Sequence, residues 1–347
     1  MLLAAAGSCP AQEAWRGIWE GTIGKQAVRV CLDDAARYYY LKHGRDIHLR
    51  QEEGAQGAWL EEEGYGDKLT GKWQLAQDGA DALHGTWSNP EGGKHWPILL
   101  RRTAPAMATD RSLCDAGQFF KPVADAKKLV AGPAKAFGRH SYQELSTRIQ
   151  ERGKQESYAP NAVVLRDYGA NGAAVNQVLQ QRLRERIARH LDTRMNGLAE
   201  SSEEVVWLSD RWLSLREIEW PNGHGISSID NWFETWDLST ATKVDLFRWF
   251  NARAGVWHEE QGEQVFSPSK ALYKAIGPYD DNGGDPQCKD RDKSWGRPRL
   301  APGGIEFEAG FGPCMDIAIA SYKTLQPFLN DEGLRQVAAL QREAVKP

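Results

Sequence analysis

The sequence predicts an α+β protein: an N-terminal small antiparallel β-barrel or sandwich, followed by an α+β domain. Short runs of alternating apolar and polar residues, separated by turn residues, fill the first third of the chain. Strand-like runs and one long helical repeat follow in the remainder. At 347 residues, the chain is long enough for two domains that each have a core.

The N-terminal residues 1–11, MLLAAAGSCPA, have the apolar and small residues that end a secretory signal peptide. We therefore expect a signal-peptide remnant here and export to the periplasm. Anchoring as a lipoprotein through Cys9 is the less favoured alternative. No later stretch has the apolar length of a membrane-spanning helix, so the sequence predicts no transmembrane segment.

Residues 12–103 predict one antiparallel β-domain, because turn residues recur between short alternating runs. Such strands can close into a barrel or stack as a sandwich. The abundance of tryptophan, 14 in the chain, favours an interior filled by side chains over one that holds a ligand. The expected strands are Trp15–Ile23, Ala27–Leu32, Tyr38–Lys42, Ile47–Gln51, Ala58–Glu62, Gly71–Ala76, Leu83–Trp87 and Trp96–Arg101.

Residues 104–135 are rich in Ala and Pro and show little periodicity, which predicts a linker. Removal of the signal peptide would leave four cysteines, an even number that suggests disulfides in an exported protein. We predict the pairs Cys31–Cys114 and Cys288–Cys314, since each pair then stays within one domain. Buried free thiols are the alternative. The cysteines lack C-x-x-C spacing and the histidines do not cluster near them, so no metal site is predicted.

Residues 136–347 predict the α+β domain. Its first elements are a short helix over Ser141–Gly153 and a strand over Ala162–Tyr168. A long helix opens near Asn171-Gly172, and its apolar face is expected at Val175, Val178, Leu179, Leu183, Ile187 and Leu191. The opposite face, with Gln180, Gln181, Arg184, Glu185, Arg186 and Arg189, is expected to be solvated; a basic surface for a partner is the alternative.

The aromatic-rich stretch from Trp207 to Phe250 should anchor the core of this domain. Two alternating runs, Trp212–Trp220 and Asn231–Leu238, flank a long loop of Gly, Ser and Asn and predict a hairpin. A short amphipathic segment, Val244–Phe250, follows. A strand over Glu263–Phe266, a helix over Pro268–Ile276 and a polar loop come next. In that loop Asp280, Asn282 and Asp285 do not fit a calcium-binding register.

Residues from about 130 to 335 resemble the domain at the C-terminus of the lysozyme-binding anti-sigma factor RsiV, which also accompanies some peptidoglycan deacetylases. The matching positions are Ser214-Leu215, Gly223-His224, Trp236-Asp237-Leu238, Val244-Asp245-Leu246-Phe247 and Tyr322-Leu325-Pro327-Leu329. The resemblance implies an RsiV-like fold and recognition of a protein at the cell envelope. A lysozyme-type enzyme or a secreted effector toxin would be the partner.

No motif for catalysis or nucleotide binding occurs in the sequence, so we predict no catalytic residue and no cofactor. The net charge of −4 gives no electrostatic argument for nucleic acid. We expect a non-catalytic protein that binds a protein partner, as an inhibitor or immunity protein. Acidic and aromatic loop residues should make the contact: Glu61, Glu62, Glu63, Tyr65, Trp220, His224, Asp280, Asp281 and Asp285. A cell-wall or carbohydrate-processing enzyme, or its accessory domain, is the alternative.

Overall fold

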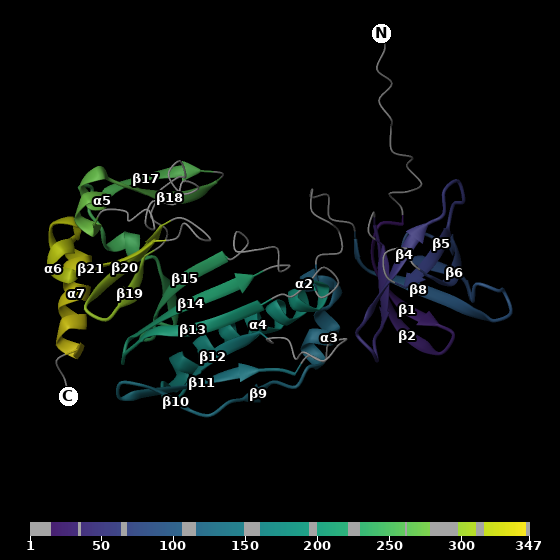
Figure 1. The fold of residues 1–347 in the computed structure, drawn as a ribbon, viewed down its shortest axis with the longest axis horizontal. Coiled ribbons are helices and arrows are strands. Elements are labelled where there is room, and N and C mark those ends of the chain that lie inside the picture. The colour runs from purple at the N-terminus through teal and green to yellow at the C-terminus, as the bar shows by residue number, and fades with distance from the viewer. Residues whose placement is uncertain are drawn as a thin grey trace, which may run out of the picture. The chain divides into compact units, whose positions relative to one another are not determined.

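The structure is a computed structural model, and it divides into two compact units, residues 1–127 and residues 128–347 (Figure 1). The residues it describes are 15–33, 36–63, 68–105, 116–148, 160–193, 200–220, 230–260, 262–277, 298–309 and 316–344. The predicted signal-peptide remnant lies outside these ranges. None of the helices in them has both the length and the apolar character to span a membrane.

The first unit contains a closed eight-stranded antiparallel β-barrel, in which each strand pairs with the next and β8 pairs with β1. The strands are β1 (Gly17–Ile23), β2 (Gln26–Leu32), β3 (Arg37–Tyr40), β4 (Asp46–Gln51), β5 (Ala58–Glu63), β6 (Lys68–Gln77), β7 (Ala82–Ser88) and β8 (His95–Pro105). Each segment that was predicted as a strand from alternation and turn residues forms a strand of this barrel. The predicted antiparallel β-barrel is therefore confirmed, and the alternative, a β-sandwich, does not form.

Large side chains fill the inside of the barrel. Trp19, Val28, Val30 and Trp73 are fully buried in one apolar cluster, because alternation along each strand turns them to the same face. At Gly21 of β1, a Cβ would lie 1.8 Å from the backbone oxygen of Leu99, so only glycine allows β1 and β8 to approach this closely.

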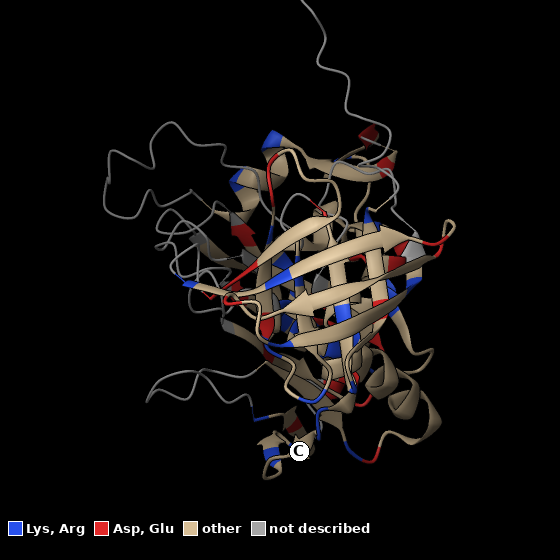
Figure 2. Cartoon of the chain, turned by 90° about the vertical axis from the view of Figure 1, so that its right-hand side faces the viewer, with Lys and Arg blue, Asp and Glu red and all other residues tan. Residues whose placement is uncertain are grey.

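Opposite charges lie across from each other on the outside of the barrel. Glu20 is in register with Arg29 on the next strand, and the two side chains form an ion pair. Arg50 of β4 pairs with Glu62 of β5 at 2.8 Å. Figure 2 shows segments of both charge signs interspersed along the described ribbon. The pair of Arg50 and Glu62 is at the surface, where such a pair contributes little to stability, whereas the Arg29 side chain is largely buried.

Two short helices, α2 (Ala116–Phe119) and α3 (Lys121–Ala126), belong to the barrel unit. The Tyr39 hydroxyl donates to the backbone oxygen of Phe119 at 2.7 Å, and its ring stacks on Phe120. Phe119 and Phe120 are both buried. Part of the segment predicted as a linker therefore packs on the barrel, because two aromatic side chains outweigh its Ala- and Pro-rich composition. The units divide after Lys127.

The second unit begins with a sheet in which β11 (His140–Ser146) pairs with β9 (Val130–Ala131), β10 (Lys135–Phe137) and β12 (Asn161–Leu165). The helix predicted over Ser141–Gly153 is wrong for the residues of β11, because pairing with three strands decides their conformation. Helix α4 (Gly169–Thr193) follows. Its predicted apolar positions are buried except Val178, which is exposed.

A second sheet has the order β13 (Glu200–Leu208), β14 (Trp212–Trp220), β15 (Asp230–Asp237) and β16 (Thr242–Val244). The predicted hairpin is confirmed as β14 and β15, which pair along their length. The 3-10 helix η2 (Leu246–Trp249) follows, and Asp245 caps it by accepting from the Phe247 backbone N–H at 2.9 Å.

The remaining elements complete an α+β unit. They are the hairpin β17 (Gly255–Glu260) and β18 (Glu263–Pro268), α5 (Lys270–Ile276), the sheet β19 (Arg299–Ala301), β20 (Gly304–Ala309) and β21 (Asp316–Ser321), then α6 (Tyr322–Leu325), η4 (Gln326–Phe328) and α7 (Asp331–Ala344). Trp212, Phe247, Trp249 and Phe250 share one buried cluster with residues from these elements. The aromatic stretch therefore forms part of the core, as predicted.

Candidate functional site

The predicted acidic triplet lies on β5, and its three residues differ in environment. Glu61 is only 6% exposed and points into the barrel, so its prediction as an exposed partner-binding residue is wrong. Alternation places Glu61 on the same face as Trp59. Glu62 lies on the outer face, where Arg50 Nε donates to it at 2.9 Å. Glu63 is exposed at the end of the strand.

Four neutral donors hold the Glu61 carboxylate inside the barrel. Its Oε2 accepts from the Tyr38 hydroxyl at 2.7 Å, from Trp87 Nε1 at 2.7 Å and from Trp73 Nε1 at 3.3 Å. Its Oε1 accepts from the Thr70 hydroxyl at 2.9 Å. Burial and the nearby carboxylate raise the pKa of Tyr38 far above its usual value. Both indole N–H groups can only donate, so Oε2 is an acceptor in each of these contacts.

Glycine at position 71 makes this arrangement possible. Gly71 of β6 pairs with Glu61, next to a register shift between the two strands. A Cβ on Gly71 would lie 2.4 Å from Trp87 Nε1 and 2.9 Å from Glu61 Oε2. The carboxylate and the indole therefore occupy the space that any other residue would fill.

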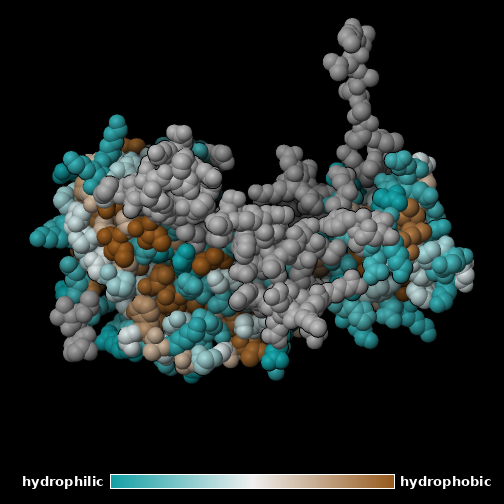
Figure 3. All heavy atoms as spheres, in the orientation of Figure 1, coloured by the Kyte–Doolittle hydropathy of each residue, from teal (hydrophilic) through white to brown (hydrophobic). Residues whose placement is uncertain are grey.

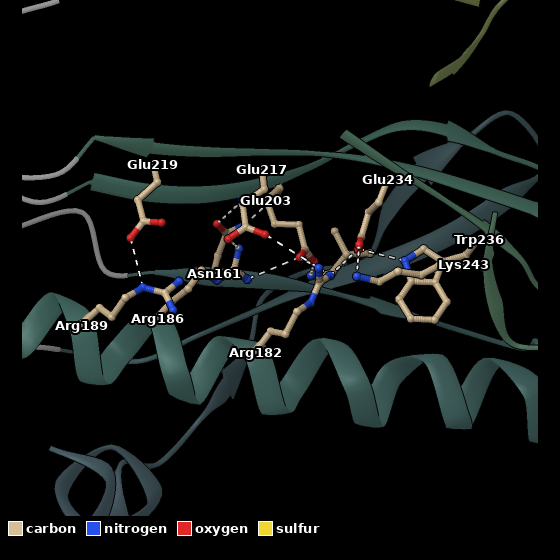
Figure 4. A network of polar contacts seen from close by, with 11 residues as sticks. Asn161, Arg182, Arg186, Arg189, Glu203, Glu217, Glu219, Glu234, Trp236 and Lys243 are labelled. Carbon is tan, nitrogen blue, oxygen red and sulfur yellow. Dashed lines mark hydrogen bonds and ion pairs between the residues drawn. The ribbon is translucent and has the colours of Figure 1, made fainter. Parts of the chain in front are cut away.

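In the second unit, arginines of α4 meet glutamates of the β13–β16 sheet in a network that is fully buried at Arg186 and Glu203 (Figure 4). Arg186 Nη1 lies 3.2 Å from Glu217, and its Nη2 lies 3.4 Å from Glu203 Oε2. Arg182 pairs with Glu234 and lies 3.3 Å from Glu203. Lys243 pairs with Glu234 at 2.7 Å. The charges therefore balance between three cations and three carboxylates: Arg182, Arg186 and Lys243 with Glu203, Glu217 and Glu234.

Backbone groups complete this network. Val163 N–H donates to Glu203 Oε1 at 2.7 Å, and Arg186 Nη2 donates to the Asn161 backbone oxygen at 2.7 Å. Burial raises the pKa of Glu203, although Arg186, Arg182 and the Val163 N–H all oppose that shift. Burial acts in the same direction on Glu234, but Arg182, Lys243 and Trp236 outweigh it and hold its pKa below the usual value.

These contacts hold α4 against the sheet. They also show that one prediction made from the sequence is wrong. Arg186 was expected on a solvated face, but its side chain is 1% exposed. Arg189, one helical turn further along, keeps a half-exposed pair with Glu219 at 3.2 Å. The sequence signal that was missed is the spacing of Arg182, Arg186 and Arg189 along one helix face, together with Glu217 and Glu219 on one strand face.

A second charged cluster lies where β19 contacts the β13–β16 sheet. The Arg299 guanidinium carbon is 3.6 Å from the centre of the Phe233 ring, and Arg299 forms an ion pair with Glu306. Its Nη1 lies 4.0 Å from Glu308 Oε2. Burial raises the pKa of Glu308 to about 7, against the opposing effect of Arg299 and Arg216.

Two isoleucines expose their side chains beside this cluster. In the register of β20 and β21, Ile317 is opposite Glu308 and Ile319 is opposite Glu306, so all four share one face. Ile317 is 49% exposed and Ile319 is 55% exposed. Among the described strands, β21 pairs only with β20 and forms the edge of its sheet. We call Glu306, Glu308, Ile317 and Ile319 the β21 face.

Hydrophobic residues are also grouped on the surface of the second unit in Figure 3. Exposed apolar side chains that form a group are typical of interaction sites, whereas single ones are common on any protein. The β21 face combines a pair of exposed isoleucines with a sheet edge. Both features are of the kind that interaction sites use.

Most other predicted contact residues lie outside the described residues: Tyr65, His224, Asp280, Asp281 and Asp285. Trp220 ends β14, where its backbone pairs with Glu200. Cys31 of β2 is buried and disulfide-bonded. Cys114, Cys288 and Cys314 lie outside the described residues, so the two predicted pairings stay predictions.

Within the described ranges, no group of three or more His, Cys, Asp or Glu side chains is placed to hold a metal ion. A comparison with known protein families and with curated proteins found no match to this chain.

Proposed function

We propose that this chain is an exported, non-catalytic protein that binds a secreted effector toxin or a lysozyme-type enzyme in the periplasm. It would act as an immunity protein or inhibitor. The observation that supports this proposal is the β21 face, where Ile317 and Ile319 are about half exposed on an edge strand. An edge strand offers unpaired backbone groups to a partner, and the isoleucines offer apolar contact.

The buried charges support a scaffold role. Glu61, the pair of Arg186 and Glu203, and the pair of Arg211 and Asp237 all have partners inside their own unit. Buried groups that are paired in this way hold strands and helices in place, and a rigid scaffold lowers the entropy cost of binding. The resemblance of residues 130–335 to the RsiV-like domain supports a partner at the cell envelope.

The experiment is affinity capture from envelope extract, with the wild type and the double variant Ile317→Ser/Ile319→Ser compared side by side. Val256→Ser is the matched control, because Val256 is a 62% exposed apolar residue on the separate β17–β18 hairpin. We expect the wild type and the control to retain the same partner, and the double variant to lose it.

If all three proteins captured the partner equally well, the β21 face would be ruled out as the binding site. The purified protein is assayed in parallel for hydrolysis of peptidoglycan and of lipid substrates. Turnover well above background would contradict the non-catalytic proposal and favour the cell-wall enzyme alternative.

A further inference from the structure

Glu61 differs from the other buried carboxylates in the nature of its partners. Glu203, Asp237 and Glu306 each face a guanidinium group. The partners of Glu61 in the described part of the chain are a phenol, a hydroxyl and two indoles, none of which carries a positive charge. Hydrogen bonds satisfy this carboxylate, but they leave its negative charge unbalanced inside the barrel.

An aromatic pair connects this charge to the surface. Trp87, whose indole N–H donates to Glu61, stacks on Trp96 with ring centres 4.5 Å apart and planes 14° apart. Trp87 is buried, whereas Trp96 is 43% exposed. The two residues are directly opposite each other on β7 and β8, beside the turn that joins these strands. Trp96 is therefore the partly exposed member of an aromatic stack whose buried member contacts the carboxylate.

Further rings belong to the same end of the barrel. Tyr40 is the last residue of β3, and its ring packs edge-on against Tyr38 with centres 5.5 Å apart. His43, in the following turn, lies edge-on to Tyr40. In an up-and-down barrel, the turn after β3 and the turn after β7 are at the same end. Tyr38, which donates to Glu61, links this side of the barrel to the carboxylate.

Two physical effects make this end attractive to a cation. An aromatic face carries a negative quadrupole, and cations bind best to the face of tryptophan. The carboxylate that accepts the Trp87 N–H lies at the edge of that indole, adds electron density to it and brings a full negative charge close to it. The effect is strongest where the charges are shielded from water, as Glu61 is.

The hydrogen bonds of Glu61 decide which cation fits. Its Oε2 already accepts three hydrogen bonds, so a primary ammonium group would find few acceptors to replace its water shell. A quaternary ammonium group donates no hydrogen bond and needs only charge and aromatic contact. We propose that the Trp96 end of the barrel binds a small organic cation with a quaternary ammonium group. This site is independent of the proposed protein partner.

The test is a titration of the full chain with choline and with tetramethylammonium, followed by calorimetry and by tryptophan fluorescence. Sodium chloride at equal ionic strength provides the baseline. Dimethylbutanol, the neutral carbon analogue of choline, separates charge from shape. We expect both cations to bind and the neutral analogue to bind at least about tenfold more weakly.

Variants locate the site. Trp96→Ala should weaken binding of choline about tenfold or more, and Glu61→Gln should do the same because it removes the charge but keeps the shape. Trp232→Ala is the matched control, since Trp232 is a 47% exposed tryptophan of the second unit, and it should bind as the wild type does. Trp96→Ala decides the question if Glu61→Gln fails to fold, because Trp96 is partly exposed.

Three results would overturn the proposal. The first is no binding of either cation by the wild type at about 10 mM. The second is equal binding of choline and of dimethylbutanol, which would mean that the charge is not recognised. The third is binding that Trp96→Ala leaves unchanged, which would place the cation elsewhere on the chain.

Discussion

Arg186 of α4 and Glu203 of β13 meet inside the second unit with both side chains at most 1% exposed, and Arg186 Nη2 lies 3.4 Å from Glu203 Oε2. A charge buried to this degree is tolerated only with a partner, because removal from water costs each ion several kcal/mol. The pair therefore fixes how the helix lies on the sheet, although replacement of both residues by apolar ones need not destabilise the fold.

Removal of one partner should be strongly destabilising. Glu203→Ala would leave Arg186 buried with fewer acceptors and the Val163 N–H unpaired, so we expect the free energy of unfolding to fall by about 3–5 kcal/mol. Urea denaturation followed by circular dichroism measures this change.

Glu219→Ala is the matched control for Glu203→Ala. It breaks an ion pair between the same helix and sheet, but the Arg189 side chain in that pair is 42% exposed. We expect a loss of less than about 1 kcal/mol. If both variants lost the same free energy of unfolding, burial of an ion pair would not determine how much that pair contributes to stability.

A second prediction concerns Gly71→Ala. The added methyl group would collide with Trp87 Nε1 and with Glu61, and neither group can move without breaking their hydrogen bond. We expect a loss of about 1–3 kcal/mol in stability, as for other overpacked cores. Thermal unfolding of the full chain is the measurement.

Gly93→Ala provides the comparison for Gly71→Ala. A Cβ at Gly93 would meet nothing within 4 Å. This variant should match the wild type to within about 0.5 kcal/mol. If Gly71→Ala were as stable as Gly93→Ala, the barrel interior would be looser around Glu61 than the structure indicates.

Some of this architecture could be predicted from the sequence. Alternation and turn residues are local signals, and they located all eight barrel strands and the hairpin of β14 and β15. The position of Glu61 could not be found in this way, because three successive glutamates resemble an exposed turn and hide the alternation. The burial of Arg186 depends on a sheet distant in sequence. The conformation of His140–Ser146 depends on pairing with three other strands.

The stability of the protein should depend on the ionisation of Glu308. Burial raises its pKa from the ordinary 4.5 to about 7. Between these values the folded protein holds a proton that the unfolded chain has lost, so the free energy of unfolding falls as the pH rises from about 4.5 to about 7.

Glu308→Gln should remove this dependence on pH. We expect the variant to be more stable than the wild type by about 1–3 kcal/mol above pH 7, with the difference shrinking as the pH falls towards 4.5. Denaturation curves at a series of pH values measure it. Parallel pH profiles for the two proteins would mean that Glu308 ionises as an exposed carboxyl group does.

The cysteine pairing can be predicted more sharply with the structure than without it. The backbone oxygen of Gln118 in α2 accepts from Arg29 of β2 at 3.0 Å, so the chain shortly after Cys114 lies beside the strand that holds Cys31. We therefore expect a Cys31–Cys114 disulfide that stabilises the barrel by about 2–5 kcal/mol. Non-reducing peptide mapping by mass spectrometry should recover this linked pair, and also Cys288–Cys314. A linkage of Cys31 to any other cysteine would contradict the assignment.

The central claim is that the β21 face binds a protein partner, and the most direct test is the dissociation constant of the captured partner. Calorimetry would compare the wild type, Ile317→Ser/Ile319→Ser and Val256→Ser. We expect the double variant to bind at least tenfold more weakly, a loss of about 1.4 kcal/mol or more, and Val256→Ser to bind as the wild type does. A double variant with wild-type affinity would contradict the claim.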